Sequence, residues 1–245
     1  GGFGGAGAGG GGAATAQRDS LKAMFEDARA YGKAKAARAS DKSVRRPPTD
    51  LALEALQPVV NGTMPVLFAG TTAANIRDII AFSDSVKIRP IILGGRDALQ
   101  VADLLKEKNV PVLLSGVRAL PSREDDAYDV NYTLPAKLAA AGVRFAITSG
   151  EDTPDTRDLP YVAGVAAAFG LSRDDALKAV TLWPAQIFGV GDKLGSLEVG
   201  KVANLVVTTG DLLEARTETK YLFIDGRLVP LDTKHSQLWE MFKDR

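Results

Sequence analysis

The sequence lacks cysteine and has a single histidine, His235, among its 245 residues. Without cysteine, disulfide bonds, thiolate nucleophiles and cysteine-ligated metals are excluded, and the cellular compartment stays open. No apolar run approaches the ~20 residues that a membrane-spanning helix needs. Because Lys+Arg and Asp+Glu both number 30, no net charge favours a nucleic-acid or membrane partner. The remaining composition, 45% hydrophobic and 24% charged, is typical of a globular chain.

The chain begins at Gly1, with neither a methionine nor a signal peptide, so we expect a fragment or a processed product. Residues 1–12 are mostly glycine, which buries no side chain and costs backbone entropy on ordering. A phosphate-binding glycine loop would need a strand before it, and none is predicted. We therefore predict a surface loop here.

A helical segment follows the glycine-rich stretch. Residues 15–37 place Leu21, Met24, Phe25, Ala28 and Tyr31 on one stripe, which predicts an amphipathic helix. Residues 38–48 are basic but lack aromatic residues, so a solvated linker is favoured over a nucleic-acid site. A second helix is predicted at residues 50–60, capped by Thr49 and ended by Asn61-Gly62.

From residue 63 onward, short apolar strands alternate with helices. Strands are predicted at 65–68, 89–93, 111–114 and 143–147. Helices are predicted at 73–82, 97–106, 132–140, 159–169 and 173–188, the last capped by Ser172. This alternation predicts a parallel sheet covered by helices on its faces. Residues 221–229 alternate around Asp225-Gly226 and predict a hairpin, and residues 236–243 predict a terminal helix that docks on a neighbour.

The chain is expected to divide into four parts. Residues 1–62 form the glycine-rich loop and helical lead-in, and 63–192 form the strand–helix repeats. Residues 193–230 form a segment of a small β domain, and 231–245 form a helical tail.

Four segments carry a resemblance to a known family. Residues 193–207 read KLGSLEVGKVANLVV, with Asn204 in place of the usual aspartate, and residues 184–189 read PAQIFG. The hairpin at 221–229 and the loop SREDDAYD at 122–129 add to this pattern. Together they resemble the metal-dependent amidohydrolase superfamily, especially its imidazolonepropionase-like members.

The resemblance implies an α/β fold that is the second half of a (β/α)8 TIM barrel, strands five to eight, plus the C-terminal part of a small β domain. Four barrel strands alone would leave open apolar edges, which natural proteins avoid. The partner expected is therefore an N-terminal half of the barrel or a paralogous chain, in a homo- or hetero-oligomer. The loop at 122–129 favours the periplasm over the cytoplasm.

In this family, histidines on strands one, five and six and an aspartate on strand eight hold a divalent metal that activates water. By resemblance, the ligand positions of strands five, six and eight fall near Ala69, Gly94 and Gly150, none of which can bind a metal. The resemblance thus implies no metal ligand and no cofactor from this chain, and a divalent metal such as zinc only if ligands come from elsewhere.

The remaining site candidates lie in loops after the predicted strands. The pocket candidates are Thr71, Arg96, Arg118, Ser149, Glu151 and Asp152. The arginines, with Arg123, could bind an anion, and the two carboxylates could replace the missing ligand. Thr148 and Ser149 have no base assigned nearby, so no catalytic nucleophile is predicted. His235, near the chain end, is interpreted as structural.

Three functions stay open from the sequence. The first is a catalytically degenerate amidohydrolase-like subunit with a structural or binding role. The second is an active metal-dependent hydrolase of non-peptide, cyclic-amide C–N bonds, with ligands supplied upstream. The third is a binding module for a small ligand.

Overall fold

The computed structural model describes residues 11–150 and 153–244. The chain forms two compact units. The first runs to Gly116 and includes Lys137–Arg144, and the second consists of Val117–Ala136 and the chain from Phe145 onward. None of the helices in the described residues is both long and apolar enough to cross a membrane.

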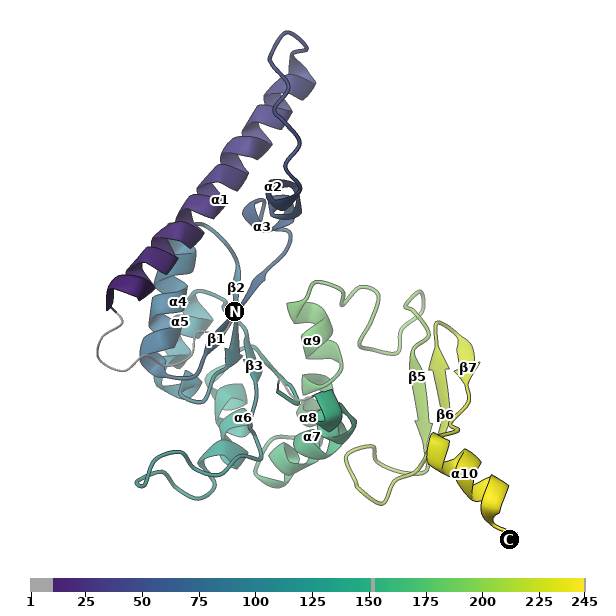
Figure 1. Cartoon of the computed structure of the whole chain (residues 1–245). Helices are drawn as coiled ribbons and strands as arrows, with labels where there is room; N and C mark the ends of the chain where they lie inside the picture. Colours follow the sequence, from purple (N-terminus) through teal and green to yellow (C-terminus); the bar gives the residue numbers. More distant parts are fainter. Residues whose placement is uncertain (1–10, 151–152, 245) are drawn as a thin grey trace. The chain divides into compact units, whose positions relative to one another are not determined.

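The first unit opens with the long helix α1 (Gly11–Ser40), which contains the predicted helix at 15–37 (Figure 1). The loop predicted at residues 1–12 is wrong at its end, because Gly11 and Gly12 are helical. Ala13, Ala14 and Ala16 follow them, and alanine has the highest helix propensity, so the helix extends into the glycines. The rest of the predicted loop lies outside the described residues.

One face of α1 packs on the first unit. Phe25, Ala28 and Tyr31 are buried, whereas Met24, predicted on the same stripe, is 37% exposed. Phe25 joins a core cluster with three buried residues from two other segments, which are Val59, Val86 and Ile88. The Arg29 guanidinium donates to the backbone carbonyls of Val86 and Lys87, which fixes α1 against the loop before the second strand.

The helix predicted at 50–60 is two short helices, α2 (Leu51–Ala55) and α3 (Gln57–Val60). Pro58 lacks an N–H and its ring blocks the preceding turn, so the helix cannot continue through Leu56. Thr49 was predicted as the cap, but Asp50 performs this role. Its carboxylate accepts from the N–H groups of Ala52 at 2.9 Å and Leu53 at 3.0 Å.

Three parallel strands of the first unit match the predicted positions to within about two residues. They are β1 (Val66–Gly70), β2 (Pro90–Gly94) and β3 (Val112–Leu114). β1 pairs with β2 and β2 with β3, so the strands lie in chain order. The connections are α4 (Ala73–Ser85), then a 3-10 turn η1 (Ala98–Val101) that leads into α5 (Ala102–Glu107).

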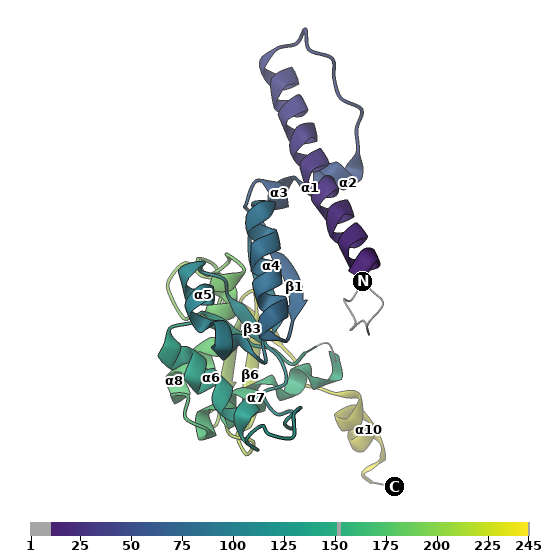
Figure 2. The ribbon, with the colours of Figure 1, turned by 90° about the vertical axis from the view of Figure 1, so that its left-hand side faces the viewer.

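The edge strand β1 differs from the inner strands of this sheet in burial, because Ile91 and Leu113 are buried on the face where β1 is exposed. Ile92, Val112 and Leu114 point to the helix-covered face and are almost fully buried. Figure 2 shows α4 alongside β1, which it contacts. On the opposite face, Leu67 is 48% exposed and Ala69 is also exposed. Since side chains alternate along a strand, the helices of this unit cover only one side of β1.

The helices around the fourth strand, β4 (Phe145–Ile147), confirm most of the predicted pattern. They are α6 (Val130–Ala141), the 3-10 helix η2 (Thr153–Asp158), α7 (Leu159–Ala168), α8 (Arg173–Ala179) and α9 (Leu182–Ile187). Ser172 caps α8 as predicted, accepting from Asp175 N–H at 3.1 Å. The single helix predicted at 173–188 is wrong, because Pro184 cannot donate to the carbonyl of Val180, and the chain breaks at Thr181.

A small antiparallel sheet follows α9, in the order β5-β6-β7 (Figure 1). Its strands are β5 (Leu205–Thr208), β6 (Thr219–Ile224) and β7 (Arg227–Val229). The predicted hairpin is confirmed, since Asp225 and Gly226 both have positive φ, as a tight two-residue hairpin turn requires. Asn204, at the position of the usual aspartate, accepts from Asp225 N–H at 2.9 Å and so braces this turn.

The chain ends in α10 (Lys234–Phe242), which Thr233 and Ser236 close with a capping box. None of the α10 residues is buried, and Trp239 is 67% exposed. The docking of this helix on a neighbour stays a prediction.

Candidate functional site

In the first unit, the loops after β1 and β2 are bonded to each other. The carbonyl of Gly70 accepts from Gly95 N–H at 2.9 Å, and the carbonyl of Thr71 accepts from Asp97 N–H at 2.9 Å. This brings two of the predicted pocket candidates, Thr71 and Arg96, into neighbouring loops at the carboxyl ends of the strands. Thr71 is exposed and Arg96 is partly exposed.

Asp97 is the charged residue at these strand ends that sequence reasoning missed. It is only 5% exposed, and its carboxylate lies 3.4 Å from the Arg96 Nε. A buried carboxylate needs a compensating cation or hydrogen bond, and the Arg96 guanidinium supplies one. The sequence holds no signal for this burial, because an aspartate after a glycine pair also fits a solvated turn.

In the second unit, the arginines predicted as anion ligands lie beside carboxylates. Arg118 Nη2 is 3.5 Å from Asp158 Oδ2, and Arg123 Nη1 is 3.9 Å from Asp126 Oδ1. The segment that carries Arg118 is held by the buried amide of Asn131, which donates to the carbonyls of Ala119 and Leu120. An incoming anion would therefore compete with these carboxylates for both arginines.

After β4, Thr148, Ser149 and Gly150 form the last described part of the loop. Thr148 Oγ1 accepts from the Gly150 N–H at 3.3 Å, and Ser149 is partly exposed. The two candidate carboxylates Glu151 and Asp152 lie outside the described residues. His235 lies in the exposed first turn of α10.

The donor atoms at the described strand ends do not fit a divalent metal. Residues 69 and 94 carry a methyl group and a hydrogen, and residue 150 carries only a hydrogen. Across the described ranges 11–150 and 153–244, no group of three or more His, Cys, Asp or Glu side chains lies together as a metal site would require. In each unit a carboxylate near the strand ends faces an arginine, Asp97 beside Arg96 in the first unit and Asp158 beside Arg118 in the second.

The chain is similar to known proteins of one family. Residues 1–229 match the sequence profile of the amidohydrolase family. An imidazolonepropionase from Syntrophobacter fumaroxidans is 35% identical over 82 residues, which are 32% of this chain and 19% of that protein.

Solved structures agree with this match. An amidohydrolase from Thermotoga maritima MSB8 is 25% identical, with a TM-score of 0.76, over 86% of this chain and 55% of that one. A prolidase complexed with N-methylphosphonate-L-proline is 22% identical, with a TM-score of 0.51, over 67% of this chain and 45% of the prolidase, and this shows a shared fold only. The chain spans about half the length of these structures. With a family match over most of its length, the chain belongs to the amidohydrolase family.

Proposed function

We propose that this chain is the second half of an amidohydrolase barrel, strands five to eight, and acts as a catalytically degenerate subunit. It would provide scaffold and ligand-binding surface to a barrel that an N-terminal half or a paralogous chain completes. The observation that carries the proposal is the uncovered face of β1, where Leu67 is 48% exposed and Ala69 is exposed.

The pairing of β1 supports the same reading. In the described residues, β1 pairs only with β2 and stands at the edge of its sheet. In a closed barrel such an edge pairs with the preceding strand, and an interior-facing leucine packs in the barrel core. A half-barrel therefore accounts for both the free edge and the exposed leucine. The match to about half of the Thermotoga amidohydrolase is consistent with this arrangement.

The proposed loss of catalytic activity rests on the side chains at the expected metal-ligand positions. If Ala69, Gly94 and Gly150 occupy the ligand positions of strands five, six and eight, this half supplies neither imidazole nor carboxylate there. This chain then provides no side chain at these positions that could bind a metal and so help to form a metal-bound hydroxide. What remains at the carboxyl ends of the strands is polar: Thr71, Arg96, Arg118 and Ser149 would line the mouth of the completed barrel.

Metal analysis of the complete assembly tests this proposal. We expect no stoichiometric zinc, manganese or iron that depends on residues of this chain. Asp152→Ala should leave any bound metal and any hydrolysis unchanged, because the proposal assigns no metal ligand and no catalytic group to this chain. Asp174→Ala, at an exposed aspartate in the first turn of α8, is the control.

Two results would favour the other functions. Stoichiometric metal that is lost with Asp152→Ala, together with hydrolysis of a cyclic amide, would establish the active hydrolase. Saturable stabilisation of the assembly by a small ligand without product would instead identify a binding module.

A further inference from the structure

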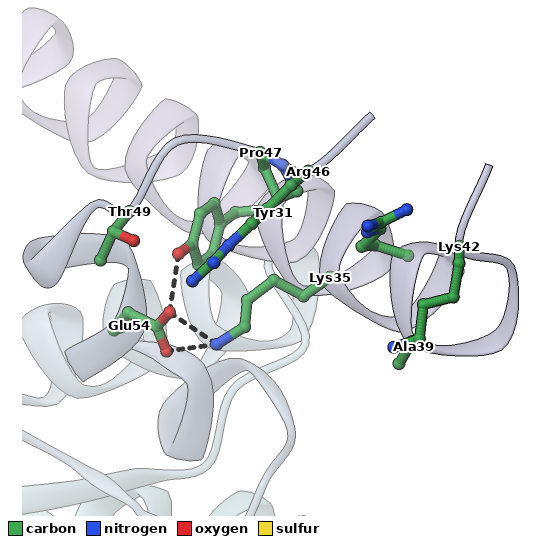
Figure 3. Close-up of a pocket in the computed structure, with 9 residues that line it drawn as sticks. Tyr31, Lys35, Ala39, Lys42, Arg46, Pro47, Thr49 and Glu54 are labelled. Atoms are coloured by element: carbon green, nitrogen blue, oxygen red, sulfur yellow. Dashed lines mark hydrogen bonds and ion pairs between the residues drawn. The ribbon is translucent and has the colours of Figure 1, made fainter. Parts of the chain in front are cut away.

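A groove of about 330 Å³ lies in the first unit, between α1 and the segment that connects α1 to α2 (Figure 3). Its walls are formed by Tyr31, Ala39, Pro47 and Thr49 together with five charged side chains. All of these residues precede β1, so the groove is separate in sequence from the strand-end loops described above. None of the pocket candidates predicted from the sequence lines this groove.

The groove has a strong excess of positive charge. Four cations line it, Lys35, Arg38, Lys42 and Arg46, against the single carboxylate of Glu54. Glu54 is already bonded: Lys35 Nζ lies 2.5 and 2.7 Å from its two oxygens, and the Tyr31 hydroxyl donates to it at 2.7 Å. These bonds lower the pKa of Glu54 and raise the pKa of Lys35, so the pair stays ionised.

The other three cations have N–H groups that donate no hydrogen bond to the described residues. Arg38 donates one hydrogen bond, from Nη1 to the carbonyl of Val44 at 3.1 Å. Lys42 and Arg46 make no hydrogen bond or ion pair with any residue in the described part of the chain. In Figure 3 the side chains of Arg46 and Lys35 lie close together, and Arg46 lowers the pKa of Lys35, although the bond to Glu54 outweighs it. An uncompensated cluster of this kind has a favourable potential for an anion.

The spacing of the cations limits the size of the anion. Lys35 and Arg38 lie at i and i+3, about one turn apart near the end of α1, and Lys42 lies in the turn that follows the helix. A single monovalent anion would neutralise one of these groups and leave the others repelling each other. A ligand with two or more anionic groups can reach cations from both walls of the groove, and arginine offers a planar fork that suits phosphate and carboxylate oxygens.

We propose that this groove is a binding site for a small polyanion that carries at least two phosphate or carboxylate groups. Lys42 and Arg46 are its principal ligands, Arg38 assists them, and the Glu54–Lys35 pair closes one end. A single-stranded nucleic acid fits the groove less well, because its one aromatic ring, Tyr31, is 9% exposed and offers little surface for base stacking.

Calorimetric titration of the full chain, in the complete and soluble assembly, tests this site. The probes are pyrophosphate and citrate, with inorganic phosphate as the smaller comparator, all at one ionic strength. We expect saturable binding of pyrophosphate, of citrate or of both, and weaker binding of inorganic phosphate. The two polyanions also identify whether phosphate or carboxylate groups are preferred.

Substitutions then assign the binding to the groove. Arg46→Gln and Lys42→Gln should each weaken the preferred polyanion about tenfold, the effect of one lost charge-assisted hydrogen bond. Arg45→Gln is the matched control, because Arg45 is the exposed neighbour of Arg46 and does not line the groove. Since neither Lys42 nor Arg46 bonds to a described residue, the melting temperature without ligand should not change.

Equal weakening in the Arg45 control would show general surface attraction and overturn the proposal. Absence of saturable binding by both polyanions would do the same. Tight binding of a single-stranded oligonucleotide with no binding of pyrophosphate or citrate would overturn the proposal and show that the groove binds nucleic acid.

Discussion

Glu54 joins α1 to α2 through its bonds to Lys35 and Tyr31. The hydrogen bond from Lys35 is the first cause of its lowered pKa, and the bond from Tyr31 is the second. A carboxylate whose pKa is lower in the folded than in the unfolded state stabilises the fold above the unfolded value, about 4.3 for glutamate. That contribution is lost as the pH falls through the lower folded pKa.

Glu54→Gln should therefore lower the melting temperature at neutral pH, and this difference should shrink as the pH falls below about 4. Thermal unfolding of both proteins, each in the complete assembly, from pH 3 to pH 7 measures it. Glu26→Gln, an exposed glutamate on α1, is the control and should show no such trend. A difference between wild type and Glu54→Gln that grows in acid would contradict the assigned bonding.

At the scale of elements, α7 and the loop between β5 and β6 approach closely within the second unit. A Cβ atom added at Gly164 would lie 2.5 Å from the carbonyl oxygen of Leu213, closer than real side chains come. Leu213 is buried there, and Arg173 of α8 bonds the same loop through Asp211 at 2.7 Å and Glu214 at 2.8 Å. The backbone of the helix at Gly164 thus lies against the backbone of the loop at Leu213, with no room for a methyl group.

Gly164→Ala should destabilise the protein by roughly 1–3 kcal/mol, although alanine favours helix, because the backbone at Leu213 must shift. Urea unfolding of wild type and variant, each in the complete assembly, measures this change. The control is Gly210→Ala, where the added methyl meets only the Thr217 hydroxyl at 3.2 Å, and a side chain can rotate away. Equal or greater stability of Gly164→Ala would mean that the loop does not pack on α7 as described.

At the scale of the whole molecule, the uncovered face of β1 predicts how the chain behaves alone. Burial of one leucine side chain contributes about 1.5–3 kcal/mol, and here a leucine and a free strand edge are exposed together. We expect the isolated chain to aggregate or to unfold without cooperativity, and to become soluble when the first half of the barrel is present. Analytical ultracentrifugation of the two preparations measures this difference.

Leu67→Gln should reduce the self-association of the isolated chain, whereas Leu99→Gln should not. Leu99 is 39% exposed, so it is a comparable exposed leucine, but it lies in η1 rather than on β1. A monodisperse monomer of the wild-type chain that melts cooperatively would show that the half-barrel proposal is wrong.

Local patterns in the sequence were sufficient to predict the positions of the strands, the hairpin and most of the helices. Apolar runs bounded by turns located β1 to β4, the Asp225-Gly226 pair located the hairpin, and Ser172 marked the start of α8. Each of these depends on a few consecutive residues, whose backbone preferences and hydrogen bonds are local. The motif near the C-terminus also pointed to the family, which the match over residues 1–229 confirmed. The helix predicted at 173–188 is broken before Pro184, and this break also follows from a local property, since proline has no N–H to donate.

Tertiary structure decided the properties that depend on which segments meet. Asp97 is buried because its loop bonds to Thr71, 26 positions earlier in the chain. The basic segment predicted as a solvated linker, residues 38–48, is largely exposed, and its residues Arg38, Lys42 and Arg46 also line a groove with Glu54 of α2. Leu67 is apolar and sits in a strand, yet it is exposed, because burial requires a covering element and the described residues provide none on that face. Sequence determined the elements, and long-range contacts determined which of their side chains are buried, paired or free.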